Sequence, residues 1–398
     1  MATFIKLEEP RVRVGPPAGF ALWELGFRPF YLLASAFAAL SIGLWALQFS
    51  GVLGRPYLDG PIWHAHEMLF GFALAVVVGF LLTAGRNWSG QPTPTGRPLM
   101  ALAALWIVAR LLVLTPFGWA AAAANVAFPL AAAFALGRAL VKGSSRRNYF
   151  FIGLLVLLSL AALAIHLSQL GVAPALGWPA VQVALDVLLF IVSVMTGRVL
   201  PMFTNNGVPG AGAVSRPAVN LLASGAVLAL LAVDLVQAPG WAIALVATLA
   251  ALAQLLRSLL WKPWKTLRQP IVWVLHVACA WIAVHLAMRA LAQPGWIPAS
   301  LATHALTVGV VGGLIVGMMT RTARGHTARP LRADRWDVAL YALVLAAAPV
   351  RVFVPLAAPS LTLHAVLCAA LLWSAGFGLY AVRYWPVLTR PRLDGRPG

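Results

Sequence analysis

The chain has 398 residues, of which 61% are hydrophobic and only 10% are charged, and its mean hydropathy is +0.87. Soluble domains carry about a quarter charged residues, so this composition excludes a soluble globular protein of this length. The net charge of +19 does not indicate a nucleic-acid partner, because the basic residues are not clustered on one element. They alternate along the chain in the pattern that is typical of a membrane protein.

Twelve apolar stretches follow one another from Arg28 to Tyr384, each near the length of about 20 residues that a membrane-spanning helix needs. They are expected at 29–50, 62–84, 98–116, 118–141, 148–170, 179–204, 217–237, 241–260, 270–292, 300–321, 336–356 and 359–382. The sequence therefore predicts an all-α, polytopic membrane protein of about 12 transmembrane helices. We expect one integral membrane domain over residues 1–398, with short tails at 1–27 and 385–398.

The segments between these stretches alternate between strongly basic and nearly uncharged. One side receives 24 of the 29 lysines and arginines, and the other side receives only Arg55, Arg289 and Arg351. The remaining two, Arg28 and Arg110, lie at or within spans, Arg110 near the middle of the third. Because the basic side of a polytopic protein faces the cytoplasm, both tails are expected to be cytoplasmic.

Most histidines fall on the side that lacks charge. Six of the eight lie near the outer ends of predicted spans, namely His64, His66, His166, His285, His304 and His364. Imidazole is a common metal ligand, and an ionisable group within lipid is costly unless it has a function. We therefore expect a metal or haem centre toward the outer face. His276 lies just on the cytoplasmic side of mid-membrane, and His326 is expected in a cytoplasmic loop.

The sharpest local motif is WHAHE at residues 63–67. Residues two apart on a helix point about 200° away from each other, so His64 and His66 cannot comfortably chelate one metal. Each can instead face a different flat cofactor. Glu67 is expected on the same face as His64, where it could orient that ring or relay protons, and it is the candidate catalytic residue. The alternative is a helix that simply begins at the interface, with wetted polar residues.

Other groups within the spans leave two explanations open. His276 and Cys279 share a face of the ninth span and would suit copper, although a buried cysteine is more often a small hydrophobe. Arg110 could bind a haem propionate, and Asp186 and Asp234 could carry protons. A structural arginine–aspartate pair explains these charged groups equally well.

The tenth span carries Gly309, Gly313 and Gly317, each four residues apart. This stripe allows close approach of another helix or of a flat macrocycle, and helix packing is the favoured explanation. We find no convincing sequence repeat between the two halves of the chain, which counts against a transporter built from inverted repeats.

Several segments resemble the NnrS family. They are LGFRPF at 25–30, WHAHEMLFG at 63–71, GRVLPMFTN at 197–205, HALTVG at 304–309, GMMTR at 317–321 and GHTAR at 325–329. The last departs from the Gly-His-Thr-Gly-Arg that the resemblance leads us to expect. His64, His66, His276, His304 and His326 fall inside or beside these patterns, whereas His166, His285 and His364 do not.

The resemblance implies a bacterial inner-membrane protein of nitric oxide metabolism, linked to denitrification and to relief of nitrosative stress. It implies one or two haem b groups, with copper as a possible second metal and an unknown electron donor. The expected metal ligands are His64, His66, His276, His285, His304 and His364, and Arg110 and His326 are further cofactor-binding candidates. A gathering of arginines beside His326 could bind an anion or a propionate. The chain is then either a nitric-oxide-metabolising oxidoreductase or a protein that binds nitric oxide. The alternative is a multi-span transporter or channel for a metal ion or anion that uses intramembrane His, Asp and Arg.

Overall fold

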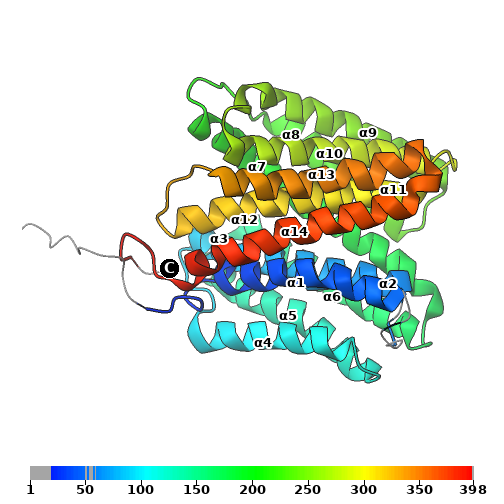
Figure 1. Ribbon diagram of the computed structural model, residues 1–398, viewed down its shortest axis with the longest axis horizontal. Helices are drawn as coiled ribbons and strands as arrows, with labels where there is room; N and C mark the ends of the chain where they lie inside the picture. The colour runs from blue at the N-terminus through cyan, green and yellow to red at the C-terminus, as the bar shows by residue number, and fades with distance from the viewer. Residues whose placement is uncertain (1–18, 50–51, 53–56, 59, 397–398) are drawn as a thin grey trace, which may run out of the picture.

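The computed structural model describes residues 19–49, 52, 57–58 and 60–396. Arg55 and the basic residues of the first 18 positions lie outside the described residues. Within the described part, helices are joined by short turns and no strand is present, which confirms the all-α fold. Most helices run along the long axis of the molecule and form one bundle (Figure 1).

The helices follow the expected order. The first half contains α1 (Phe27–Phe49), α2 (Gly60–His66), η1 (Glu67–Ala73), α3 (Leu74–Ser89), α4 (Gly96–Leu112), α5 (Gly118–Lys142), η2 (Arg146–Asn148), α6 (Phe150–Gln169), η3 (Pro174–Leu176) and α7 (Gly177–Gly207). The second half contains α8 (Pro217–Leu235), α9 (Gly240–Leu260), η4 (Pro263–Thr266), α10 (Pro270–Ala292), α11 (Ala299–His304), η5 (Ala305–Gly312), α12 (Gly313–His326), α13 (Arg335–Ala357), η6 (Pro359–Leu361) and α14 (Thr362–Thr389). Two of the short elements, η1 and η5, are π-helices. Each is continuous with its neighbours, so α2–η1–α3 and α11–η5–α12 are single long helices.

Eleven helices in the described part of the chain are long and apolar enough to cross a membrane. The remaining expected span is α4, whose 17 residues measure about 26 Å at 1.5 Å per residue, the lower end of the spanning range. It ends at Leu112 rather than at residue 116, because the chain turns ahead of Pro116, and residues that precede proline disfavour helix. Arg110 therefore lies in the last turn of α4, not near the middle of a span.

Two helices extend further than the sequence predicts. α12 continues to His326, so this histidine ends a helix and the expectation that it lies in a loop is wrong. α14 continues to Thr389, a few residues past the expected start of the tail. In α12, polar and basic residues occupy the last turns, which a hydropathy pattern counts as loop although the backbone remains helical. In α14, Arg383 stands at the expected boundary and mostly apolar residues continue the helix beyond it.

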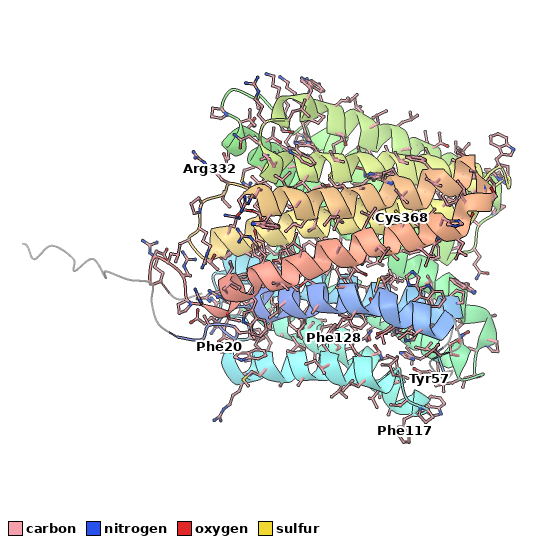
Figure 2. The ribbon with its side chains drawn as sticks, in the orientation of Figure 1. Phe20, Tyr57, Phe117, Phe128, Arg332 and Cys368 are labelled. Carbon is pink, nitrogen blue, oxygen red and sulfur yellow. The ribbon has the colours of Figure 1, made fainter. Side chains whose placement is uncertain are left out.

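The bundle has two chemically different ends. We call one the histidine end; it carries His64, His66, His166, His285 and His304. We call the other the basic end; it carries Arg86, Arg324, Arg329 and Arg392. Figure 2 shows Tyr57 and Phe117 at the histidine end, with Arg332 and Phe20 at the basic end. The separation of histidines from basic residues along the sequence is thus a separation in space.

The glycine stripe of the tenth span packs against α10. A Cβ added to Gly309 would lie 2.5 Å from the ring of Trp281, and one added to Gly313 would lie 2.8 Å from Ala278. Gly317 likewise faces Leu275, at 2.7 Å. All three contacts are on α10, so the stripe serves helix–helix packing and leaves no space there for a macrocycle.

The hairpin of α8 and α9 covers one edge of the bundle (Figure 1). Only 22% of the apolar window of α8 and 28% of that of α9 are buried, against 67% for α10. At the basic end, the buried Arg257 guanidinium donates to the carbonyl oxygen of Ser193 at 2.9 Å, and Gln254 donates to the Ala223 carbonyl at 3.1 Å. These bonds join α9 to α7 and α8.

Candidate functional site

Both long helices that contain a π-helix place histidine directly before it. α2 ends with His64 and His66, and η1 begins at Glu67; α11 ends with His304, and η5 begins at the next residue. Each segment also reads His-x4-Gly, from His66 to Gly71 and from His304 onward. π-Helical segments are rare in proteins, and many of those that occur lie at functional sites. The two elements therefore indicate a functional site at the histidine end independently of the histidines.

His64 faces His304 across the histidine end. Their ring centres are 6.5 Å apart and their planes are nearly parallel, at 12°. Trp45 of α1 stacks on His64, with its ring centre 5.3 Å from that of the imidazole. Arg351 of α13 is close enough for its charge to act on both imidazoles. The first pair therefore combines two parallel imidazoles, an aromatic wall and a cation.

His66 faces a different partner, His166 of α6. These two ring centres are 4.8 Å apart, and the planes meet edge to face at 71°. His66 is fully buried, as is His166. The Tyr57 hydroxyl forms a hydrogen bond with Nδ1 of His166, and the two rings stack 5.8 Å apart. The His-x-His motif thus contributes one imidazole to each of two separate pairs, as its spacing predicts.

Glu67 holds the second pair in place. Its Oε1 accepts a hydrogen bond from Nδ1 of His66 at 2.8 Å and an ion-paired bond from Nη1 of Arg110 at 2.6 Å. The expectation that Glu67 would orient His64 is therefore wrong, because its carboxylate turns toward His66 instead. Arg110 also donates to the Asn125 side-chain oxygen, so both of its terminal nitrogens have protein partners.

A third group of polar residues lies along the outer part of α10. Nδ1 of His285 donates to the carbonyl oxygen of Ala302 at 2.7 Å. One turn later, Nη2 of Arg289 donates to both carboxylate oxygens of Asp234 at 2.7 Å, and Nη1 lies 3.6 Å from Asp186. The structure therefore favours the structural arginine–aspartate pairing over free proton-carrying carboxylates.

Four predicted site residues lie apart from the two pairs. Nε2 of His276 is hydrogen-bonded to the Thr204 hydroxyl at 2.7 Å, while Cys279 lies beside Arg257 and Thr196. His326 contacts the ring of Phe27 at the basic end, 22 residues and roughly 30 Å of helix from His304. His364 is exposed at the start of α14. The structure does not bring these residues together with the paired histidines.

The hydrogen bonds prepare several imidazoles as metal ligands. Nδ1 of His66, of His285 and of His304 meets an acceptor oxygen, which for His304 is the Ser300 carbonyl at 2.6 Å. Nδ1 then carries the proton, and Nε2 keeps its lone pair for a metal. Nε2 of His66, of His166 and of His285 is buried and has no hydrogen-bond partner. A buried unpaired nitrogen costs free energy, which a bound metal would offset.

The separations within the two pairs fit shared ligation. With metal–nitrogen bonds of about 2 Å, two imidazoles that bind one ion have ring centres about 4.5–6.5 Å apart. The ring centres of His64 and His304 are 6.5 Å apart and those of His66 and His166 are 4.8 Å apart, so the separation within each pair is compatible with one shared ion. No three His, Cys, Asp or Glu side chains cluster as a metal site among the described residues, so each centre would rest on two protein ligands.

Sequence reasoning gave least weight to residues that the structure places centrally. His166 lies outside the family patterns, and Tyr57 and Asn125 were not candidates at all. The available signal for His166 was its depth, which matches that of His66. Tyr57 and Asn125 approach the site only through tertiary packing, and nothing in their local sequence marks them.

These observations define a class of protein. It is a multi-pass membrane protein in which four imidazoles form two pairs at one end of the bundle, and one of these pairs has buried nitrogens without partners. A family model described as NnrS protein matches residues 21–392, nearly the whole chain. The chain belongs to the NnrS family, which connects it to nitric oxide. No curated protein matches the chain.

Proposed function

We propose that this protein is a bacterial inner-membrane haem protein that binds or reduces nitric oxide and thereby relieves nitrosative stress. The observation that carries the proposal is the arrangement of two histidine pairs at one end of the bundle, in one of which, His66 with His166, both Nε2 atoms are buried without a hydrogen-bond partner. His64 and His304 would hold one haem b, and His66 and His166 would hold a second metal centre, a haem or a copper ion. The positive-inside rule orients the basic end to the cytoplasm and the histidine end to the periplasm.

Bound haem iron supplies a centre that binds nitric oxide and transfers electrons. The chain's own residues set the conditions around it. Glu67 fixes the tautomer and direction of His66, and Arg110 pairs with the same carboxylate and holds it in place. Arg351 places a cation beside His64 and His304, where it favours an anionic cofactor group. Glu67 and Tyr57 are thus positioning residues that act through their histidines.

Transport is the competing function, because intramembrane ionisable residues also serve ion pathways. Two acidic candidates for such a path, Asp186 and Asp234, both lie against Arg289, which donates two hydrogen bonds to Asp234 and lies 3.6 Å from Asp186. Their mutual pairing supports a structural role, and for that reason we favour the haem function.

The first experiment is an optical spectrum of the detergent-purified protein, expressed with haem supplied, in oxidised and reduced states and with metal analysis. We expect a b-type spectrum that changes when nitric oxide is added to the reduced protein. His64→Ala and His304→Ala should each remove the same haem, whereas His66→Ala and His166→Ala should remove the other centre. Consumption of nitric oxide by reduced protein would identify an oxidoreductase rather than a binding protein.

His364→Ala is the matched control, because His364 lies at an outer helix end yet is exposed and outside both pairs. Its spectrum and metal content should equal those of the wild type. Folded protein that stays colourless and metal-free despite haem supply would overturn the proposal and favour transport. Loss of haem from the His364 variant but not from the His64 variant would also overturn it.

A further inference from the structure

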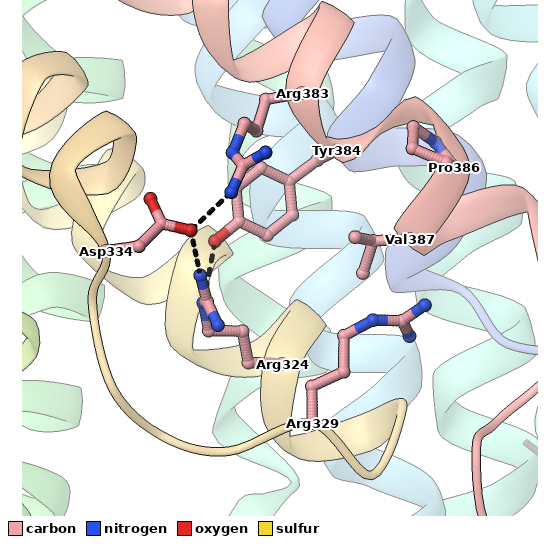
Figure 3. A pocket seen from close by; sticks show the side chains of 7 residues that line it. All are labelled: Arg324, Arg329, Asp334, Arg383, Tyr384, Pro386 and Val387. Atoms are coloured by element: carbon pink, nitrogen blue, oxygen red, sulfur yellow. Dashed lines mark hydrogen bonds and ion pairs between the residues drawn. The ribbon is translucent and has the colours of Figure 1, made fainter.

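A shallow pocket of about 240 Å³ opens at the basic end, where the end of α12, the loop before α13 and the last turns of α14 meet (Figure 3). Its lining residues are Arg324, Arg329, Asp334, Arg383, Tyr384, Pro386 and Val387. Three arginines thus share this space with one carboxylate, and the pocket carries an excess of positive charge.

Two of the three arginines have anionic partners. Arg324 donates to Asp334 at 3.1 Å and to Asp337 at 2.5 Å, and Arg383 is bonded to the same Asp334. Figure 3 shows both guanidinium groups joined to that carboxylate. Asp334 and Asp337 are also engaged in the capping box that begins α13. The two carboxylates are therefore fully committed and cannot neutralise a further cation.

Arg329 is the cation that remains. Its Nη1 is buried and has no hydrogen-bond partner, and Figure 3 shows its guanidinium beside Val387 with no interaction drawn. Burial lowers the pKa of Arg329, and the neighbouring charges of Arg324 and Arg390 lower it further. A half-buried guanidinium that faces like charges costs free energy, and an anion between these charges would make the interaction favourable.

The backbone around Arg329 is held firmly, so the side chain is presented by a built loop. The Arg329 amide donates to the carbonyl oxygen of Arg324 at 2.8 Å, and the Thr327 hydroxyl donates to that of Ala323 at 2.6 Å. The C-terminal segment closes over the loop, because the Leu393 amide donates to the Thr327 carbonyl at 3.2 Å. These bonds fix Arg329 near the pocket even though its own head group has no partner.

The surroundings of the pocket indicate the depth at which it lies. Trp336 at the start of α13 and Trp385 near the end of α14 are 46% and 55% exposed. Exposed tryptophans at helix ends mark the boundary between hydrocarbon and head groups. Val382, one turn before Trp385, is 77% exposed on an apolar part of α14. The pocket therefore lies at the level of lipid phosphates.

We propose that this pocket binds a phosphate group, with Arg329 and Arg324 as its donors. Arginine binds phosphate through charge-assisted, bidentate hydrogen bonds, and basic pockets between helix ends are known to receive anionic phospholipid head groups. A head-group phosphate and free inorganic phosphate share this chemistry. The site lies at the opposite end of the bundle from the paired histidines, so the inference does not depend on the proposed haem function.

The test uses full-length protein, delipidated in a non-ionic detergent, with thermal unfolding and native mass spectrometry as readouts. Phosphatidylglycerol, phosphatidylcholine and inorganic phosphate are titrated separately. We expect phosphatidylglycerol to raise the unfolding temperature and to remain bound in the mass spectrometer. Arg329→Gln should weaken that binding by about tenfold, the loss expected for a charge-assisted hydrogen bond. Arg332→Gln, an exposed change in the same loop, should not.

The outcomes separate the two sources. Stabilisation by phosphatidylglycerol alone identifies a lipid site, and equal stabilisation by inorganic phosphate identifies a soluble ligand; both support the proposal if Arg329→Gln removes them. Equal effects of phosphatidylglycerol and phosphatidylcholine, or equal losses in the Arg329 and Arg332 variants, would overturn it. Without lipid, the Arg329→Gln variant should be at least as stable as the wild type, because it lacks the unpaired charge, and this readout excludes a general folding defect.

Discussion

The buried ion pair of Glu67 and Arg110 allows a quantitative test of how the histidine end is held together. Both side chains are almost fully buried, and the carboxylate oxygen lies 2.6 Å from the guanidinium. Glu67→Gln leaves the buried Arg110 without a counterion, although the Asn125 side-chain oxygen still accepts from it. Loss of one member of a buried pair costs about 3–5 kcal/mol. The retained bond to Asn125 places the expected loss in the free energy of unfolding near the lower figure, about 3 kcal/mol.

The double variant Glu67→Gln/Arg110→Gln removes both charges and leaves no ion without a counterion. It should therefore be more stable than Glu67→Gln alone, although it carries one more substitution. The measurement is reversible unfolding in mixed detergent micelles, on protein prepared without haem so that ligand binding does not contribute. Asp394→Asn, which breaks the exposed pair with Arg392 at the surface, is the control and should leave the unfolding midpoint unchanged. The losses in the free energy of unfolding are also measured for Glu67→Gln and for Arg110→Gln separately. If these two losses add in the double variant to within about 0.5 kcal/mol, the argument for this pair is refuted.

Three further predictions concern packing, backbone conformation and capping. Gly313→Leu should destabilise the protein by about 1–3 kcal/mol, because even a Cβ there would lie 2.8 Å from Ala278. The control is Gly153→Leu, at an exposed position where a Cβ meets nothing within 4 Å, and its unfolding midpoint should stay near that of the wild type. Equal losses in the two variants would contradict the packing argument. Ala328→Gly should raise the unfolding midpoint, since Ala328 adopts φ +58°, which costs an L-residue roughly 1 kcal/mol that glycine avoids; a lower midpoint would show that the loop is not strained. Asp334→Ala should cost about 1 kcal/mol through loss of the cap, while Asp334→Asn keeps the cap and loses only charge. Burial alone would raise the pKa of Asp334, but hydrogen bonds from the Asp337 amide and from Arg383 outweigh it and hold that pKa below its usual value. The stabilisation is therefore present above about pH 4, where the unfolded chain is also ionised, and is lost as the pH falls through the folded pKa. Unfolding midpoints of wild type and Asp334→Asn should converge in acid, and a constant difference would count against the assignment.

The helices were predictable because a helix that crosses lipid needs a long and mainly apolar segment. Segments such as 270–292, which the structure reproduces as α10, carry apolar residues on every face and end at prolines or short turns. The errors occur at helix ends. α12 continues through polar and basic residues to His326, and α14 continues past Arg383 to Thr389, because backbone hydrogen bonding does not depend on the hydropathy of the side chains.

The candidate site was only half predictable for a related reason. The spacing of His64 and His66 predicts that their side chains diverge, because residues two apart on a helix point in nearly opposite directions. Their partners, His304 and His166, come from distant helices whose rotation is set by packing, and no local pattern encodes it. Glu67 illustrates the limit, because its carboxylate follows Arg110 of another helix rather than the neighbour three residues earlier.

The loop at 325–329 shows that one departure from a pattern can carry structural information. Glycine was expected at position 328, and the backbone there does adopt the left-handed conformation that favours glycine. The sequence motif therefore encodes a backbone shape, and the chain keeps that shape with alanine at a small cost. The hydrogen bonds on either side of Ala328 explain how the conformation is retained.

The lipid-exposed hairpin of α8 and α9 has a consequence for how the protein assembles. Helices already inserted in a bilayer gain no hydrophobic free energy by meeting, so polar contacts and close packing decide where they dock. For this hairpin the polar contacts are concentrated at its two ends, at Asp234 with Arg289 and at Arg257 with Ser193. It can therefore enter the membrane as a separate unit and join a bundle that is already formed. Substitution at either contact should loosen the attachment of this hairpin to the bundle while the paired histidines stay assembled.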